Sequence, residues 1–296
     1  MCGIVGAVAQ RDVSGILLEG LKRLEYRGYD SAGMALISAQ TSEIDCIRAL
    51  GKVEKLEEAM TRRPFVGQIG IAHTRWATHG EPSEKNAHPH ISRADIALVH
   101  NGIIENYLSF RDELIAAGYQ FDSETDTEVI VHLIHKVGKE KGLSLLDAVK
   151  ETVSRLHGAY GLCVINRNEP DKIIVARSGS PLVIGVGIGE NFVASDALAL
   201  GQVTDRFMYL EEGDIAEITL KSVRIWNGDK KVNRPITHIA SEVAEVEKGE
   251  YGHFMLKEIY EQPRAIADTI AGSIREVYGE VLLEDLNLVD ATLAGL

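Results

Sequence analysis

The chain begins with a short apolar run, Gly3–Ala9, that follows directly on Met1 and Cys2. A run of this length predicts a buried strand, so folding must bury the chain almost from its first residue. A secretory signal peptide would carry basic residues before a longer apolar stretch, whereas Arg11 and Asp12 follow this run almost at once. We therefore expect no signal peptide and a strand that starts at the third residue.

The spacing of apolar residues over the rest of the chain predicts both helices and strands. Helical periodicity follows Asp12, an expected N-cap, and runs to Leu24. Further helices are expected over residues 53–62, 104–117, 128–139 and 144–156. Strands are expected over residues 32–37, 44–50, 68–74, 95–100, 161–165, 172–176, 182–187, 191–194, 207–210 and 214–218. This order indicates layered sheets and helices over residues 1–240, followed by an acidic linker and a helical tail from His253 to Tyr278.

Composition and charge narrow the class of protein. The 296 residues are 45% apolar and 25% charged, which is typical of a soluble globular protein. The net charge of −13 argues against a nucleic-acid-binding protein, because contacts to phosphates call for a basic patch. No run approaches the roughly 18 apolar residues of a membrane span. We therefore expect no nucleic acid and no membrane among the partners.

The cysteines and histidines do not predict a metal site. Three cysteines, Cys2, Cys46 and Cys163, are too few and too scattered for a disulfide framework or a zinc site. Their odd number suits a reducing compartment, so we expect the protein in the cytoplasm. Five histidines lie between residues 73 and 100, but none has HExxH spacing and two of them flank Pro89 in a loop.

Met1-Cys2-Gly3 is the most informative tripeptide of the chain. Initiator methionine is generally removed when the next side chain is small, which would make Cys2 the N-terminus. A terminal cysteine combines a base and a nucleophile, because its α-amino group has a pKa near ~8 and its thiolate attacks acyl carbons. If Met1 were retained, it would block this amine. The alternative is that Cys2 is a small buried residue at the start of a strand.

A polar loop and a dipeptide offer further candidates. Residues 75–90 show no apolar period and are interrupted by Gly80, Pro82 and Pro89. Long loops in compact domains are often functional. Asn101-Gly102 follows the strand expected over residues 95–100, where a side-chain amide and a backbone N–H can converge on one oxygen. An ordinary turn is the alternative explanation of this dipeptide.

Five segments together resemble one known family. They are Met1–Gly6, Tyr26–Gly33, Gly70–Gly80, His100–Asn106 and Ser123–Glu128. In this order they are similar to the N-terminal-nucleophile, or class II, glutamine amidotransferases, and the resemblance covers essentially the whole chain. It implies an α+β fold, a four-layer αββα sandwich of the N-terminal-nucleophile hydrolase type. It also implies hydrolysis of the side-chain amide of L-glutamine to glutamate and ammonia, with no metal and no organic cofactor.

The resemblance assigns the catalytic roles. Cys2 is expected to be the nucleophile that forms a thioester, and Asn101 and Gly102 match the family's oxyanion hole. Arg27 lies in a motif that lines the family's site near the terminal amine. Trp76 resembles the aromatic residue of a mobile loop that shields this site from water. Packing is the alternative role for Arg27 and Trp76.

The resemblance also assigns contacts to the two ends of glutamine. Arg75 matches the residue that pairs with the α-carboxylate, where a planar guanidinium gives two hydrogen bonds. Thr78 and His79 match positions that add contacts to that carboxylate. Asp126 matches the acceptor for the α-ammonium group, with a helix N-cap as its alternative or additional role.

The C-terminal part resembles the start of a second domain. Residues 253–263 are similar to the lead-in to the sugar isomerase half of family members that act on fructose 6-phosphate. We expect a glutaminase domain over residues 1–240, and a linker with the start of the isomerase half over residues 241–296. The chain stops at Leu296 before an isomerase domain could fit, so we interpret it as an N-terminal fragment whose missing partner is that C-terminal isomerase domain. The sequence leaves open a homodimer, the glutaminase half of another class II enzyme such as amidophosphoribosyltransferase, and a non-catalytic glutamine-binding module.

Overall fold

The computed structural model describes residues 2–38, 41–76, 80–239, 251, 254–270, 274–275 and 280–281. Contacts divide the chain into two units, Met1–Ala244 and Glu245–Leu296, and each has its own internal structure. The expected domain boundary at residue 240 lies outside the described residues, as does the acidic linker except for Tyr251.

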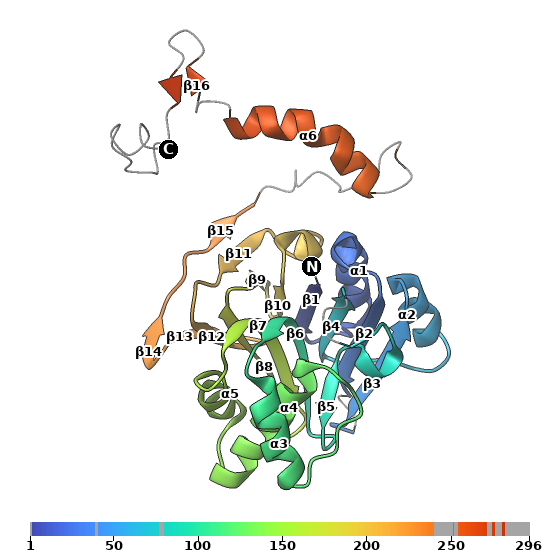
Figure 1. Cartoon of the computed structure of the whole chain (residues 1–296), viewed down its shortest axis with the longest axis vertical. Coiled ribbons are helices and arrows are strands. Elements are labelled where there is room, and N and C mark those ends of the chain that lie inside the picture. Colours follow the sequence, from blue (N-terminus) through green and yellow to red (C-terminus); the bar gives the residue numbers. More distant parts are fainter. Residues whose placement is uncertain are drawn as a thin grey trace. The chain divides into compact units, whose positions relative to one another are not determined.

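Two antiparallel sheets form the centre of the first unit (Figure 1). The first sheet has eight strands, in the order β15 (Thr237–His238), β11 (Arg206–Tyr209), β9 (Val183–Val186), β10 (Asn191–Ala194), β1 (Gly3–Val8), β4 (Ile69–Arg75), β2 (Ser31–Ile37) and β3 (Ile44–Leu50). The second has seven, in the order β14 (Lys230–Val232), β13 (Val223–Asn227), β12 (Asp214–Thr219), β8 (Lys172–Ser178), β7 (Gly158–Asn166), β6 (Ile96–Ile104) and β5 (His90–Ser92). Strand β1 pairs with β10 on one side and β4 on the other, so the chain is buried from Gly3 to Val8, as predicted.

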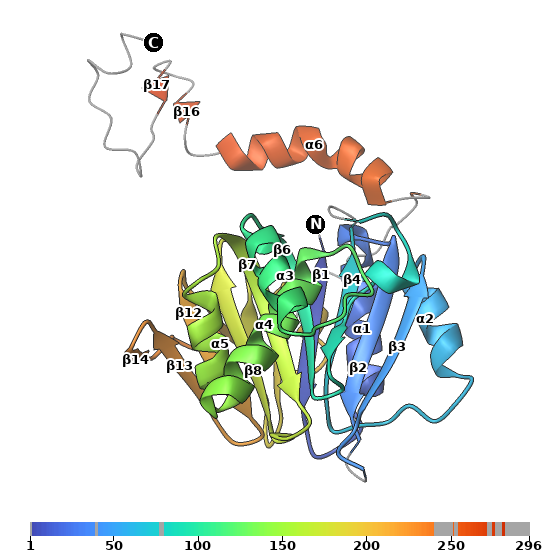
Figure 2. The ribbon, with the colours of Figure 1, turned by 60° about the horizontal axis from the view of Figure 1, so that its bottom comes forward.

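Helices cover the outer face of each sheet (Figure 2). They are α1 (Ser14–Leu24), α2 (Val53–Met60), α3 (Tyr107–Ala116), α4 (Asp126–Lys141) and α5 (Leu145–Val153). Helices α1 and α2 pack on the first sheet, and the other three pack on the second. A third apolar core lies between the sheets. The first unit therefore has the four αββα layers that were predicted.

Strand β1 shows how the sequence pattern builds these layers. Successive side chains of a strand point to opposite faces of a sheet. Ile4 and Val8 accordingly lie in the core between the two sheets, whereas Val5 and Ala7 lie in the core under α1. Because both faces are covered, the strand is apolar throughout instead of alternating with polar residues.

Helix α1 starts differently from the expectation. Its N-cap is Val13, which makes no side-chain capping bond, and not Asp12. The Asp12 carboxylate instead accepts the N–H of Ser14 at 3.4 Å and that of Gly67 at 2.9 Å. Asp12 therefore ties the start of the helix to the segment that leads into β4. Single 3₁₀ turns follow elsewhere, at η1 (Glu25–Arg27), η2 (Glu84–Asn86) and η3 (Ala197–Leu200).

Several strands were missed or ended too early. β5, β13, β14 and β15 were not predicted. β5, β14 and β15 are only two or three residues long, and β14 and β15 are also largely exposed and show no apolar pattern. β13 has five residues, of which only Ile225 is buried. Strand β6 was expected to end at His100 but continues to Ile104. It continues because β7 pairs with it along its whole length, with Asn101 opposite Gly161 and Gly102 opposite Tyr160.

The second unit contains helix α6 (Phe254–Ile270), with Pro263 inside it, and strands β16 (Ile274–Arg275) and β17 (Glu280–Val281), which pair with each other. The prediction of a helix through Tyr278 is therefore wrong. Gly272 and Ser273, which follow α6 in the sequence, are poor helix formers and could have signalled its end. No helix in the described part of the chain is long and apolar enough to cross a membrane.

Candidate active site

Cys2 lies at the start of β1 and faces the residue that follows β4. Its Sγ accepts the Trp76 N–H at 3.2 Å, and the thiol also lies 3.5 Å from the Trp76 carbonyl oxygen. Burial raises the pKa of the Cys2 thiol, while the Trp76 hydrogen bond and the charge of Arg75 lower it. The thiol is thus held at a fixed place beside the end of β4, within reach of a cationic side chain.

The end of β6 brings a side-chain amide to the same place. Asn101 Nδ2 donates to the Cys2 carbonyl oxygen at 3.1 Å. Asn101-Gly102 lies inside the strand and not after it, which corrects the turn that the sequence suggested. Gly102 has a φ of +133°, and a Cβ there would lie 2.0 Å from the Ala159 carbonyl oxygen. Only glycine fits this conformation and this close approach of β7.

The first turn of α4 supplies a buried carboxylate. Thr125 is the N-cap of this helix, and its hydroxyl accepts the Glu128 N–H. Asp126 is the first helical residue, so the alternative role of N-cap is wrong for it. Its Oδ2 accepts the Ile104 N–H at 2.8 Å, which fixes the carboxylate against the end of β6.

Arg75 ends β4 and is 3% exposed. Its guanidinium donates to the carbonyl oxygens of Gly80 (3.0 Å) and Glu81 (3.4 Å). Burial lowers its pKa, while the charges of Cys2, Asp30 and Asp126 raise it. The arginine therefore holds the chain that returns from the loop after β4, and it lies among acidic groups.

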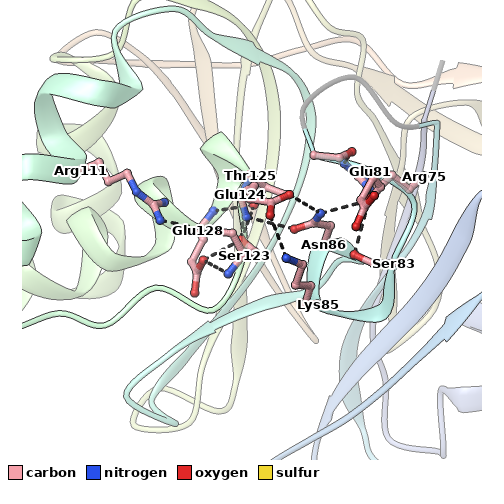
Figure 3. Close-up of polar contacts among 11 residues, drawn as sticks. Arg75, Glu81, Ser83, Lys85, Asn86, Arg111, Ser123, Glu124, Thr125 and Glu128 are labelled. Carbon is pink, nitrogen blue, oxygen red and sulfur yellow. Dashed lines mark hydrogen bonds and ion pairs between the residues drawn. The ribbon is translucent and has the colours of Figure 1, made fainter.

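Asn86 joins this returning chain to the segment before α4 (Figure 3). Its Nδ2 donates to the Glu81 carbonyl oxygen at 3.0 Å and to the Glu124 carboxylate at 3.2 Å. Its Oδ1 accepts the Glu124 N–H at 3.0 Å, and Lys85 pairs with the same carboxylate at 2.8 Å. One buried asparagine thus connects the segment after Arg75 with the segment before Asp126.

These elements surround one pocket. Its lining residues are Cys2, Arg75, Trp76, His88, His100, Gly102, Thr125, Asp126 and Thr127. The pocket brings together five residues that the sequence singled out, from four separate segments. Asn101 lies beside it through its bond to Cys2. Thr78 and His79 lie outside the described residues.

Arg27 lies in a different environment from the pocket lining. It forms an ion pair with Asp196 and donates to the Tyr26 hydroxyl at 2.9 Å. Asp196 follows Ser195, whose Oγ accepts the Ile4 N–H at 3.0 Å. Arg27 is therefore linked to the segment that flanks β1 just after Cys2.

Four lining residues were not predicted as part of the site: His88, His100, Thr125 and Thr127. For His88 and His100 the signal available was the cluster of histidines, which was considered only as a metal site. Thr125 and Thr127 lie in the segment Ser123–Glu128, from which only Asp126 was singled out. Among the described residues, no group of three or more His, Cys, Asp or Glu side chains is placed to hold a metal ion. The histidines instead form a buried polar layer, in which the His73 and His88 rings lie 4.2 Å apart.

Comparison with known proteins shows what this chain is similar to. Residues 73–202 match the family model of the glutamine amidotransferase domain. Over 93% of its length, the chain is 59% identical to the glutamine–fructose-6-phosphate aminotransferase (isomerizing) of Pseudomonas putida. The chain therefore contains a glutamine amidotransferase domain. The isomerizing aminotransferase of Aliivibrio fischeri is 56% identical over 98% of the chain. The chain spans about half the length of these curated relatives, covering 45% and 48% of them.

Solved structures share the fold of the amidotransferase domain. The glutamine phosphoribosylpyrophosphate amidotransferase of B. subtilis, complexed with ADP and GMP, matches with a TM-score of 0.66 and 26% identity, over 79% of this chain and 50% of that chain. The glutamine aminotransferase class-II domain protein of Silicibacter pomeroyi matches with a TM-score of 0.52 and 15% identity, over 76% of this chain and 99% of that chain. The second likeness concerns the fold alone. The αββα sandwich is thus the fold of class II amidotransferases.

Proposed function

We propose that this chain hydrolyses the side-chain amide of L-glutamine to glutamate and ammonia, with Cys2 as the nucleophile. The observation that carries the proposal is the single pocket that is lined by the Cys2 thiol, the buried Arg75 guanidinium and the buried Asp126 carboxylate. Beside it an amide donor lies 3.1 Å from the Cys2 carbonyl oxygen. Acyl transfer needs a nucleophile, donors for an oxyanion, and groups that hold the two charged ends of a free amino acid.

The proposed reaction starts once Met1 has been removed. The α-amine of Cys2 takes the thiol proton while Sγ bonds to the amide carbon of glutamine. The tetrahedral oxyanion accepts hydrogen bonds from Asn101 Nδ2 and the Gly102 N–H, and removing one such donor costs about 10²–10³ in kcat. The amine then returns the proton to nitrogen, ammonia leaves, and a γ-glutamyl thioester remains. Water cleaves the thioester and releases glutamate.

Binding of free glutamine is proposed to depend on its two charges. The Arg75 guanidinium pairs with the α-carboxylate, and Thr78 and His79 add contacts to it. The Asp126 carboxylate accepts a hydrogen bond from the α-ammonium group. Its Oδ2 already accepts the Ile104 N–H. A cation and an anion in one pocket favour a zwitterion over a glutamine within a peptide, which has neither free end.

Two further residues complete the proposal. Arg27, through its contact with Asp196, keeps the chain around Cys2 in place. Trp76 shields the pocket from bulk water. Its side chain is 46% exposed and its backbone contacts Cys2 Sγ, so it lies at the mouth of the pocket.

In the longer protein, we propose that the ammonia is used to convert fructose 6-phosphate into glucosamine 6-phosphate on a C-terminal isomerase domain. The 59% and 56% sequence identity to isomerizing aminotransferases supports this acceptor. Sequence identity to the phosphoribosylpyrophosphate amidotransferase of B. subtilis is only 26%. A homodimer in the cytoplasm is part of the same proposal, and the free state of all three cysteines suits a reducing compartment.

Intact mass spectrometry with 6-diazo-5-oxo-L-norleucine, a glutamine-like alkylating agent, tests the proposed function. We expect loss of Met1, one covalent adduct on Cys2, and glutamate production from glutamine. Cys2→Ala should abolish both the adduct and turnover while leaving glutamine binding nearly intact. Cys46→Ala is the matched control, because Cys46 is a free thiol away from the pocket, and it should behave like the parent protein. A processed Cys2 that binds glutamine without an adduct or turnover would indicate a non-catalytic binding module.

A further inference from the structure

A buried histidine outside the expected site contacts the proposed oxyanion-hole amide. His73 on β4 is 0% exposed. Its Nε2 lies 3.0 Å from the His100 carbonyl oxygen and 3.1 Å from Asn101 Oδ1. Strand β4 belongs to the first sheet and β6 to the second, so this contact joins the two sheets beside Cys2.

The surroundings of His73 decide where its hydrogen is. A backbone carbonyl oxygen only accepts hydrogen bonds, so Nε2 must carry a hydrogen that it donates to His100. Burial lowers the pKa of His73 to about 3, so the ring is neutral near pH 7 and this hydrogen is its only one. His88 Nδ1 lies 3.3 Å from the same Nε2 and faces the hydrogen as a further acceptor. Nδ1 of His73 is bare and has no hydrogen-bond partner in the described part of the chain.

The hydrogen on His73 in turn orients Asn101. A side-chain amide has a donor end and an acceptor end of nearly the same shape, and its partners determine which way it points. Because His73 donates, the atom of Asn101 that faces it is Oδ1, and Nδ2 faces Cys2. In the flipped amide, Oδ1 would face the Cys2 carbonyl oxygen, and two N–H groups would meet at His73. Both contacts would be repulsive.

We infer that His73 is a positioning residue that fixes the Asn101 amide with its donor toward Cys2. The inference rests on the proposed function, because the direction of Asn101 Nδ2 affects turnover only if it donates to an oxyanion. It also accounts for a polar side chain with 0% exposure where β4 meets β6. Hydrogen bonds are stronger in the low-dielectric interior of a protein, so the buried contact from His73 Nε2 to Asn101 Oδ1 favours one orientation of the amide.

Three substitutions of His73 test the inference by steady-state kinetics with glutamine. His73→Gln carries an amide near the position of Nε2 and can still donate to Asn101, so we expect kcat within about tenfold of the parent. His73→Asn carries its amide nearer the backbone, close to Nδ1, and His73→Leu has no donor. Both should lower kcat about 10²-fold, as loss of an oxyanion donor does. KM for glutamine should change little, because no group proposed to bind the charged ends is altered.

A double-mutant cycle separates positioning from a general effect on the fold. In an Asn101→Ala background, His73→Asn should cause no further loss of kcat, because His73 acts only through Asn101. His135→Gln is the matched control. His135 is a buried histidine on α4 that bonds to Tyr119 at 2.7 Å and Asp95 at 3.3 Å, and its exchange should leave kcat unchanged. Equal losses in both backgrounds, or equal activity of His73→Gln and His73→Asn, would overturn the inference.

A spectroscopic readout keeps the inference testable without turnover. Long-range ¹H–¹⁵N spectra of the imidazole rings, with His73 assigned by His73→Gln, should show a neutral ring with hydrogen on Nε2 between pH 5.5 and 8. A ring with hydrogen on Nδ1, or one that titrates in this range, would refute the inference. Failure of the proposed function has a different signature: the parent protein makes no glutamate, whatever the spectrum of His73.

Discussion

At the scale of single residues, the two charged side chains of the pocket, Arg75 and Asp126, already form hydrogen bonds within the protein. Arg75 holds the carbonyl oxygens of Gly80 and Glu81, and Asp126 holds the N–H of Ile104. Each of these charges is therefore fixed in place before any ligand contact is considered, which lowers the entropic cost of binding. Substitutions at such positions remove both a structural bond and a charge, so a useful test must separate the two.

Asp126→Asn makes this separation, because asparagine keeps an oxygen that can accept the Ile104 N–H but has no charge. Hydrogen bonds to charged groups contribute about 1.5–3 kcal/mol, so we expect KM for glutamine to rise roughly 10- to 100-fold. The variant should also discriminate less against 4-carbamoylbutanoate, which is glutamine without its α-amino group. Asp122→Asn, the same exchange on an exposed neighbour, serves as the control in these kinetic assays. An unchanged KM would remove Asp126 from the substrate site.

The candidate site was partly predictable from the sequence, since Cys2, Arg75 and Asp126 were singled out from motifs and the structure brings them into one pocket. The supporting residues were not. Asn86 and His73 each carry a side chain that is common in loops or cores, and nothing in their local sequence indicates a partner far along the chain. Their roles depend on contacts with Glu124 and Asn101, which only the folded chain brings near.

At the scale of elements, the start of α4 sets the position of the pocket carboxylate. The Glu128 side chain reaches back to accept the N–H groups of Asp122 (2.9 Å) and Ser123 (2.8 Å), while the Thr125 hydroxyl caps the helix. Burial raises the pKa of Glu128, but these bonds and His132 outweigh it and lower the pKa to about 2. These bonds fix the turn that carries Asp126.

Glu128→Gln should therefore weaken the fold in a pH-dependent way. At pH 7 we expect a loss of about 1–3 kcal/mol in the free energy of unfolding, because one charged acceptor of several N–H groups is removed. The unfolded pKa of glutamate is about 4.3, and the folded pKa is about 2. The contribution is thus present above pH 4.3 and is lost as pH falls toward 2, so the parent and the variant should converge.

Urea denaturation from pH 7 down to the lowest pH at which the parent protein is still folded measures this convergence. Glu54→Gln is the control, because Glu54 is an exposed acid in the first turn of α2, and it should change the free energy by no more than about 0.5 kcal/mol. A difference between Glu128→Gln and the parent that is absent at pH 7, or that does not shrink at the acid end of this range, would show that the charge of Glu128 contributes nothing.

The elements themselves were well predicted where an apolar period continued for several residues. Strand β3 and strand β10 have the bounds that were expected, and the helices of the first unit agree to within a few residues. The predictions fail where pairing with another strand, and not the propensity of the local sequence, determines whether a strand forms and where it ends. β14 and β15 are short, exposed strands held by pairing with neighbours, and β6 continues past His100 because β7 pairs with Gly102. Pairing with a distant strand leaves no signal in the local sequence.

At the scale of the whole first unit, a polar layer of histidines crosses an otherwise apolar interface between the sheets. His73 comes from the first sheet, His90 and His100 from the second, and His88 from the loop between them. Burial lowers the pKa of His73 and of His90 to about 3, and that of His88 well below its ordinary value. Through His73, His88 and His90 the two sheets are therefore joined at the site by neutral rings, whose hydrogen-bond directions hold only while they stay neutral.

This layer predicts that stability falls in mild acid. Histidine in the unfolded chain has a pKa of about 6.5. Below that pH the three histidines therefore bind protons in the unfolded chain, whereas their buried rings in the folded protein do not. Stability is then fully present above pH 6.5 and is lost as pH falls, by up to about 1.4 kcal/mol per histidine and pH unit. Urea denaturation between pH 8 and 5.5, followed by the fluorescence of the two tryptophans, both of which lie in the first unit, should show this slope. His90→Gln keeps a partner for Thr125, which bonds to His90 at 3.0 Å, and should reduce the slope by about one proton. A flat profile would mean that these rings take up protons in the folded protein as they do when unfolded, which would also exclude the neutral His73 that orients Asn101. An unchanged slope in His90→Gln would mean this of His90 alone.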